Sequence, residues 1–277
     1  MVRVLSFNIE HGAMAYGLRD VLNIIQNTKA DVAVLSEAER YEPTQDATKR
    51  VALALGWSHV FIKGNASAVI SRWNVRDVGS GRGAYTQDKS GIVLVTPPKP
   101  RRPFFVVSVH LTDFPYQPFQ ATNIKYCYGK CQVSSRDSVE LEKQAMAARG
   151  HEAIRTATVA SRLASRHPVI IAGDFNEPSH LDWTPRAASH GLVPQVIRFP
   201  ASMAFQRHGF ADAFRRRYPN EVRHPGTTWP TRDPGYAYRP DRIDFVYVRN
   251  KDEVKSIHIV NTPSDHYALI ADIRFHR

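Results

Sequence analysis

One ten-residue stretch, PVIIAGDFNE at residues 168–177, constrains the fold more than any other part of the chain. Four apolar residues follow the proline, and three of them are β-branched, which predicts a buried strand that ends near Gly173. Side chains alternate across a strand, so we expect Asp174 and Asn176 to point the same way where it ends. A carboxylate and a carboxamide there suit the positioning of a water molecule or a phosphate group, although strand ends are also polar simply because they meet solvent. Whether these residues form a site or only a solvent-exposed strand end depends on the polar residues found elsewhere in the chain.

Two strand patterns near the N-terminus also end in polar side chains. Residues 2–8 read VRVLSFN and end in Asn8, and residues 31–37 read DVAVLSE and end in Glu37. Between them, apolar residues at helical spacing predict a helix over about 18–28. Because two strands joined by such a helix run parallel, Asn8 and Glu37 are expected on the same rim of a sheet.

The rest of the chain alternates between strand and helix patterns. We expect strands at 57–62, 66–71, 91–96, 104–111, 241–248 and 268–273, and helices at 44–55, about 138–166 and 209–217. Thr44 is the expected N-cap of the first of these helices. The glycine-rich segment 79–83 lacks the strand and helix context of a phosphate-binding loop, so it is predicted to be a turn.

Residues 112–137 form a long polar and aromatic insertion between a strand and a helix. A loop of this length in a compact domain is typically functional or disordered, and its aromatic content argues against disorder. We expect the insertion to be a wall or lid of the substrate cleft, with Tyr116 in contact with substrate. Trp183 and Trp229, on two later loops, are expected to help enclose it.

Length and composition favour one large α/β domain over residues 1–277, since the chain is 43% hydrophobic and no linker divides it. The 37 Lys and Arg against 26 Asp and Glu give a net charge of +11, which favours polyanionic partners such as nucleic acid, phosphorylated metabolites or anionic lipid surfaces. The basic residues are scattered, and the short runs at 99–102 and 215–217 are predicted to be solvated surface. Charge alone selects none of these partners.

No apolar run approaches the roughly 18 residues needed to span a bilayer. The chain is therefore expected to be a soluble monomer, either cytoplasmic or secreted with its signal peptide absent from this sequence. Cys127 and Cys131 are too few for a zinc site without outside ligands. They are expected to form a local disulfide if the protein is exported, or to stay reduced in a cytoplasm.

The polar residues at strand ends form a series along the whole chain. They are Asn8, Glu37, His110, Asp174, Asn176, Asp244, Asp265 and His266. They lie in the strings FN at 7–8, LSE at 35–37, VHL at 109–111, GDFN at 173–176, RID at 242–244 and SDH at 264–266. In these strings and their order, the chain resembles the endonuclease/exonuclease/phosphatase superfamily, the deoxyribonuclease I-like metal-dependent phosphoesterases. Its members include exonuclease III, neutral sphingomyelinases and inositol polyphosphate 5-phosphatases.

The resemblance implies a four-layer α/β sandwich, with two mixed β-sheets packed face to face, helices outside and the site at one end. It also implies Mg²⁺, with Mn²⁺ as an alternative, bound by Glu37 with Asn8 and Asp265 nearby. Hard carboxylate and carboxamide oxygens fit these ions and not zinc.

The resemblance further implies roles for the remaining residues. Asp174 and Asn176 would orient the attacking water in line with the leaving group. His266, oriented by Asp244, would act as general base or as a phosphate contact, and the sequence leaves open whether Asp174 or His266 takes the proton of the water. His110 would donate a hydrogen bond to a non-bridging phosphate oxygen.

The expected reaction is hydrolysis of a phosphodiester or a phosphomonoester, with the alcohol undetermined. Cleavage of DNA or RNA is the near alternative, because a basic surface can follow a phosphate backbone and aromatic side chains can stack on bases. A phospholipid headgroup is a further candidate substrate. A catalytically silent module that binds polyanions is a remote alternative, since it predicts the loss of a catalytic group and all are present.

Overall fold

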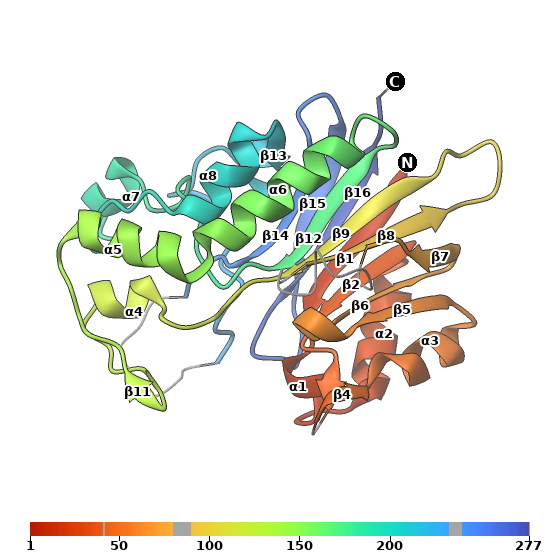
Figure 1. The fold of residues 1–277 in the computed structure, drawn as a ribbon, viewed down its shortest axis with the longest axis horizontal. Coiled ribbons are helices and arrows are strands. Elements are labelled where there is room, and N and C mark those ends of the chain that lie inside the picture. The colour runs from red at the N-terminus through yellow and green to blue at the C-terminus, as the bar shows by residue number, and fades with distance from the viewer. Residues whose placement is uncertain (41, 80–89, 233–239, 277) are drawn as a thin grey trace.

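Strands make up the centre of the molecule and helices its outer surface (Figure 1). The computed structural model describes residues 1–40, 42–79, 90–232 and 240–276. The strands are β1 Val2–Asn8, β2 Val32–Ser36, β3 Glu39–Arg40, β4 Glu42–Asp46, β5 Ser58–Ile62, β6 Ser67–Ser71, β7 Asn74–Asp77, β8 Ser90–Thr96, β9 Phe104–His110, β10 Cys127–Tyr128, β11 Lys130–Cys131, β12 Val169–Asp174, β13 Phe210–Asp212, β14 Asp244–Arg249, β15 Glu253–Val260 and β16 Ala268–Arg274. The helices are α1 Glu10–Ala13, α2 Leu18–Thr28, α3 Thr48–Leu55, α4 Gln117–Ala121, α5 Ser138–Ala145, α6 His151–Leu163, α7 Pro185–Ser189, α8 Pro200–Arg207 and α9 Ala213–Arg217, with a 3₁₀ turn η1 Lys63–Asn65 and a π-helical turn η2 Met146–Gly150.

Two six-stranded mixed sheets pack against each other. The first has the order β15-β16-β1-β2-β6-β5 and the second the order β13-β14-β12-β9-β8-β7. β1 runs parallel to β2, and β12 runs parallel to β9, whereas the other pairs within these sheets are antiparallel. With helices on both outer faces, the fold is the four-layer α/β sandwich that the sequence predicts.

The alternation of side chains along each strand builds these layers. Val4 of β1 and Ile170 of β12 point into the apolar core between the two sheets. Phe7 and Ile171, which have the opposite parity, point outward to the helices. α2 and α3 cover the outer face of the first sheet, and α6 and α8 cover that of the second. Burial on both faces explains why these strands are almost entirely apolar up to their polar ends.

Three predicted element boundaries are wrong, the first because of a local hydrogen bond and the second because of a tertiary strand pairing. α3 begins at Thr48 rather than at Thr44, because Asp46 Oδ1 accepts the backbone N–H of Thr48 at 2.8 Å and Thr44 belongs to β4. The helix expected at 209–217 is reduced to α9, since residues 210–212 pair with β14 as β13. The strand expected from residue 241 begins at Asp244.

For the remaining elements, the structure adds detail that the sequence did not predict. The helical run expected at 138–166 consists of α5, η2 and α6 in succession. β7, β15 and α8 were not predicted. The turn expected at 79–83 lies outside the described residues except for Gly79.

The insertion at 112–137 contains α4 and the β10–β11 hairpin, which a disulfide between Cys127 and Cys131 closes. Tyr116 and Phe119 of the insertion form a small apolar cluster with Ile243, against which Tyr126 and Trp229 pack. The insertion is thereby joined to the loops that precede β14. Across the described ranges, no helix has both the length and the apolar character that a membrane span requires.

Candidate active site

Six of the predicted site residues converge from the two sheets on one end of the sandwich. Asn8 ends β1, Glu37 follows β2 and His266 precedes β16, all in the first sheet, while His110 ends β9, Asp174 ends β12 and Asp244 begins β14 in the second. Asn8 has the same parity as Val4, and Asp174 the same parity as Ile170, so both face the neighbouring sheet. The register pairs Asp174 with both His110 and Asp244, which brings the three strand ends level.

Asn8 makes a polar contact between the two sheets at the site. Its buried Nδ2 donates hydrogen bonds to Glu37 Oε1 and to Asp174 Oδ2, both at 3.0 Å, and lies 3.3 Å from His266 Nε2. Its Oδ1 accepts the backbone N–H of Glu10 at 3.0 Å, and this bond fixes which way the amide is oriented. One carboxamide therefore holds a carboxylate of each sheet in place.

His266 is held between two carboxylates. Its Nδ1 lies 2.8 Å from Asp244 Oδ2, and its Nε2 lies 3.8 Å from Asp174 Oδ2. Burial alone would lower the pKa of His266, but the hydrogen-bonded Asp244 and the nearby Asp174 outweigh it and raise the pKa to about 10. Asp244 is itself fixed by Thr228, whose Oγ1 accepts the backbone N–H groups of Ile243 and Asp244. The imidazole is thus oriented and favoured in its protonated form.

Asp174 and Asn176 are arranged by the backbone after β12. Burial raises the pKa of Asp174 to about 6, and the neighbouring Asp244 adds to this while His266 and His110 oppose it. Asp174 Oδ1 accepts the backbone N–H of Asn176 at 2.8 Å. Asn176 lies beyond the strand in the left-handed region, with φ 49°, so the strand pleat does not set its direction as we had expected. Its Nδ2 donates to the carbonyl of Leu111 at 3.0 Å.

Glu37, Asp174 and His266 each offer a ligand atom, and these atoms lie within 4.8 Å of one another. Burial acts to raise the pKa of Glu37, but His110 and His266 outweigh it and the pKa is lowered, so the carboxylate is favoured. Asp265, whose pKa burial raises, accepts a hydrogen bond from Trp229 Nε1 at 3.1 Å. Within the described part of the chain, no Lys or Arg forms an ion pair with the carboxylates of Glu37, Asp174 or Asp265. This oxygen-rich donor set fits a hard divalent cation.

Part of this set lines a cleft of about 500 Å³, while Asn8, Asp174 and Asp244 are buried beside it. Its lining includes Glu37, His110, Asn176, Trp229, Asp265 and His266, together with His11, Lys63, Thr112, Asp113 and Tyr126. Thr112, Asp113 and Tyr126 belong to the insertion, which therefore forms one wall of the cleft. His11 and Lys63 were not singled out in the sequence; Lys63 directly follows the strand predicted at 57–62, which was the one signal that could have marked it.

Trp183 and Tyr116, which we expected to contact substrate, lie buried away from this cleft. Trp183 Nε1 and the Tyr116 hydroxyl donate to the two oxygens of Asp241, at 3.0 and 2.8 Å. Burial raises the pKa of Asp241 to about 7, although these two hydrogen bonds oppose the shift. Both aromatic residues thus fix the segment before Asp244, and of the three predicted aromatic contacts only Trp229 lines the cleft.

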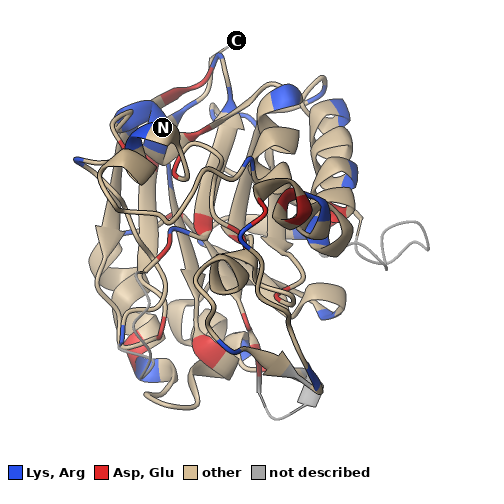
Figure 2. Ribbon diagram, turned by 90° about the vertical axis from the view of Figure 1, so that its left-hand side faces the viewer, with Lys and Arg blue, Asp and Glu red and all other residues tan. Residues whose placement is uncertain are grey.

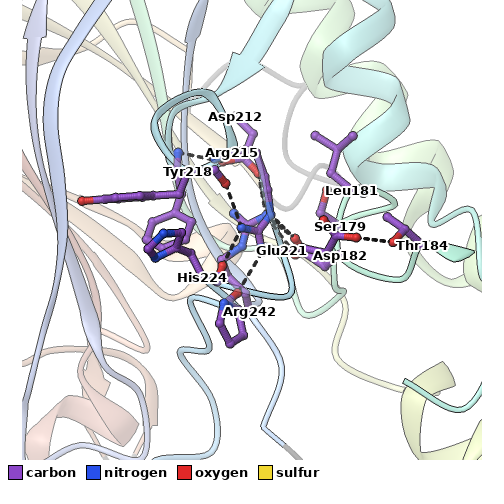
Figure 3. A network of polar contacts seen from close by, with 12 residues as sticks. Ser179, Leu181, Asp182, Thr184, Asp212, Arg215, Tyr218, Glu221, His224 and Arg242 are labelled. Carbon is purple, nitrogen blue, oxygen red and sulfur yellow. Dashed lines mark hydrogen bonds and ion pairs between the residues drawn. The ribbon is translucent and has the colours of Figure 1, made fainter. Parts of the chain in front are cut away.

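A buried ion-pair network contacts the segment that precedes Asp244 through Arg242 (Figure 3). Arg242 Nη2 contacts Asp182 and Asp212 at 2.8 and 2.7 Å, and Arg215 Nε contacts Asp182 at 2.6 Å. Burial alone would lower the pKa of Arg242, but Asp182 and Asp212 outweigh it and raise the pKa. Because Arg242 precedes Asp244 by two residues, the network anchors the strand end that orients His266. No sequence pattern indicates this network, since its members are distant along the chain.

A model of the endonuclease/exonuclease/phosphatase family matches residues 5–266. The chain belongs to this family. A curated relative in Caenorhabditis elegans, the uncharacterized protein F14F9.5, is 40% identical over an alignment of 131 positions that covers 39% of this chain and 41% of the worm protein. The match thus spans less than half of that protein.

Solved structures of other proteins share the fold of this family member. An AP endonuclease from Archaeoglobus fulgidus has a TM-score of 0.63 at 17% identity, covering 99% of this chain and 100% of that one. A variant of the 3′ phosphatase NExo from Neisseria, bound to a product DNA hairpin, has a TM-score of 0.61 at 17% identity with the same coverage. TDP2 from D. rerio, complexed with a single-strand DNA product, has a TM-score of 0.57 at 14% identity and covers 99% of both chains. At these identities the likeness establishes the fold alone.

Proposed function

We propose that this endonuclease/exonuclease/phosphatase family protein is a Mg²⁺-dependent phosphoesterase that hydrolyses a phosphodiester, or a phosphomonoester, by in-line attack of an activated water. The observation that carries the proposal is the Asn8 amide, which joins Glu37 and Asp174 of opposite sheets beside His266, and Glu37 and His266 line one cleft. Such a convergence of carboxylates, a carboxamide and an oriented imidazole suits phosphoryl transfer.

Glu37 and Asp265 are the proposed metal ligands. Asn8, which we expected as a third ligand, turns its Nδ2 toward Glu37 while its Oδ1 accepts the backbone N–H of Glu10, so we assign it to hold the Glu37 carboxylate in place. Bound by Glu37 and Asp265, Mg²⁺ polarises a phosphoryl oxygen and stabilises charge on the departing oxygen. Mn²⁺ has the same preference for oxygen ligands and is expected to substitute.

The proton-handling roles follow from the placement of His266. An imidazole held between two carboxylates retains its proton, so we assign His266 Nε2 to contact a phosphoryl oxygen. Asp174 then takes the proton of the attacking water, which Asn176 helps to orient. His110 Nδ1 donates to the carbonyl of Asn65 at 2.9 Å, so its Nε2 donates to a non-bridging oxygen in the imidazolium form, in which both ring nitrogens carry protons.

Cleavage of DNA or RNA is the second candidate. The net charge of +11 favours a polyanion, and two of the similar solved structures contain a DNA product. The face seen in Figure 2 carries Lys and Arg on several separate elements, interspersed with Asp and Glu, and not in one continuous track. We therefore keep the broader phosphoesterase as the first proposal.

The deciding experiment compares supercoiled plasmid DNA, bis(p-nitrophenyl) phosphate, a panel of phosphomonoesters and phospholipid vesicles as substrates. Each is assayed with Mg²⁺, with Mn²⁺ and with a chelator, and His266→Ala is the blank. Turnover that needs both metal and His266 supports the proposal, and efficient plasmid nicking identifies a nuclease. Silence on every substrate overturns the proposed activity and favours a module that only binds polyanions.

A further inference from the structure

Arg149 is one of the largest fully buried side chains in the described ranges, yet no part of the proposed chemistry uses it. It lies in η2, the π-helical turn between α5 and α6. Single π-turns within helices occur often at functional sites, because the extra residue redirects a side chain. Here the side chain is directed at the root of the insertion.

The Arg149 guanidinium donates hydrogen bonds to several backbone carbonyls at the start of the insertion. Nε donates to the carbonyl of Thr112 at 2.7 Å, and Nη2 donates to the carbonyls of Asp113, at 3.2 Å, and of Pro115. Nη1 donates to the side chain of Gln117 at 2.6 Å. A single planar fork therefore fixes the path of the chain from residue 112 to residue 117.

The same fork connects this segment to the strand end that carries the candidate catalytic residues. Arg149 Nη1 lies 3.5 Å from Oε1 of Glu177, the residue that follows Asn176. Glu177 is fully buried, and its Oε2 accepts the backbone N–H of Ala201 at the start of α8. The charge of Arg149 is thus partly balanced inside the protein, and its donors are used on backbone carbonyls.

A second contact from the same helix supports this arrangement. Glu152, one helical turn beyond Arg149, accepts both the backbone N–H and the hydroxyl of Thr112, at 3.1 and 2.7 Å. Thr112 and Asp113 line the cleft, as does Tyr126 farther along the insertion. The start of the cleft wall is therefore held from one helix.

We propose that Arg149 is a positioning residue that sets the cleft wall formed by residues 112–126, and so controls how tightly substrate binds. Asp174 and His266 are held independently of it, because Asp174 bonds to Asn8 and to the backbone of Asn176, and His266 bonds to Asp244. A loosened wall is expected to weaken binding and leave the chemical step nearly unchanged. The kinetic half of this inference rests on the proposed phosphoesterase function.

The test is Arg149→Lys, which keeps the positive charge but replaces five planar donors by one compact ammonium that cannot span the three carbonyls. Arg249→Lys is the matched control. Arg249 Nη1 also donates to a backbone carbonyl, that of His208, at 2.7 Å, but at the far end of β14 from Asp244. Gln117→Met is a second variant that removes one acceptor of the fork and no charge, so it carries the test if Arg149→Lys does not fold.

Two readouts are compared in the wild type and the three variants. Hydrogen exchange by mass spectrometry is expected to show amide exchange about tenfold faster over 112–126 in Arg149→Lys, and less so in Gln117→Met, with α6 and β12 unchanged. KM for bis(p-nitrophenyl) phosphate is expected to rise about tenfold in Arg149→Lys while kcat stays within about threefold. Arg249→Lys should change neither.

The outcomes separate the inference from the proposed function. Unchanged exchange over 112–126, or a fall in kcat with KM unaltered, overturns the role of Arg149. If the wild type hydrolyses nothing, the proposed function fails, and the exchange experiment still tests whether Arg149 fixes the wall.

Discussion

Asp244→Asn is the most informative single substitution, because it removes one charge from a buried pair and leaves the shape of the side chain unchanged. Asp244 is fully buried, and its Oδ2 lies 2.8 Å from His266 Nδ1. The neutral amide no longer stabilises the imidazolium, and if its NH₂ group faces Nδ1 it forces the opposite tautomer.

The size of the effect follows from the geometry. Two unit charges about 4 Å apart interact by about 4 kcal/mol at an effective dielectric of about 20. Each 1.36 kcal/mol corresponds to about tenfold in rate, so kcat is expected to fall by about 10³-fold.

The assay is steady-state hydrolysis of bis(p-nitrophenyl) phosphate with saturating Mg²⁺, beside a thermal melt of each variant. Asp241→Asn is the control, because Asp241 is another buried carboxylate three residues earlier that contacts Trp183 and Tyr116 instead of His266. It should lower the melting temperature and leave kcat within about threefold. Turnover of Asp244→Asn within tenfold of wild type, or an equal loss in Asp241→Asn, would refute the reasoning.

Three further predictions concern the metal, the backbone and pH. Glu37→Gln is expected to lower kcat by about 10³-fold and to weaken Mg²⁺ binding in calorimetry; unchanged binding contradicts its assignment as a ligand. Gly173→Ala places a Cβ 1.9 Å from the carbonyl oxygen of Val109, at φ 139°, so urea unfolding should show a loss of about 3 kcal/mol or more. Burial raises the pKa of Glu177 to about 7 against the opposing Arg149, so its contribution to stability is complete below its unfolded pKa of 4.5. About 3 kcal/mol should be lost as pH rises to 7, and urea titrations of Glu177→Gln should lack this slope.

The candidate site was largely predictable because strand geometry determines it. Asn8 and Asp174 each end a strand whose apolar residues already indicate the buried faces, and parity then directs the polar residue. Glu37 lies one residue beyond β2 with φ 50°, so the sequence indicates its end of the sheet but parity does not set its direction. The family resemblance supplied their order along the chain, and the family match confirms it. The same resemblance implied the four-layer fold, which the order of the two sheets confirms.

The parts that sequence reasoning missed depend on contacts between distant residues. Arg149 bonds to carbonyls more than 30 residues away, and nothing in its neighbourhood marks it as buried. Trp183 was expected on a loop that helps to enclose substrate, but the carboxylate of Asp241 accepts its indole N–H in the interior. The segment 210–212 has helix-forming neighbours, yet pairing with β14 makes it a strand, since tertiary contacts override local propensity.

Asn8 joins carboxylates of the two sheets, so Glu37 and Asp174 stay together only while those sheets remain packed against each other. The rate of the proposed hydrolysis therefore reports whether the two sheets are packed. Heat inactivation should superimpose on the loss of tertiary circular dichroism, with no temperature range in which the protein is folded but inert. A protein in which activity disappeared first would have to open along the seam between its sheets before it melts.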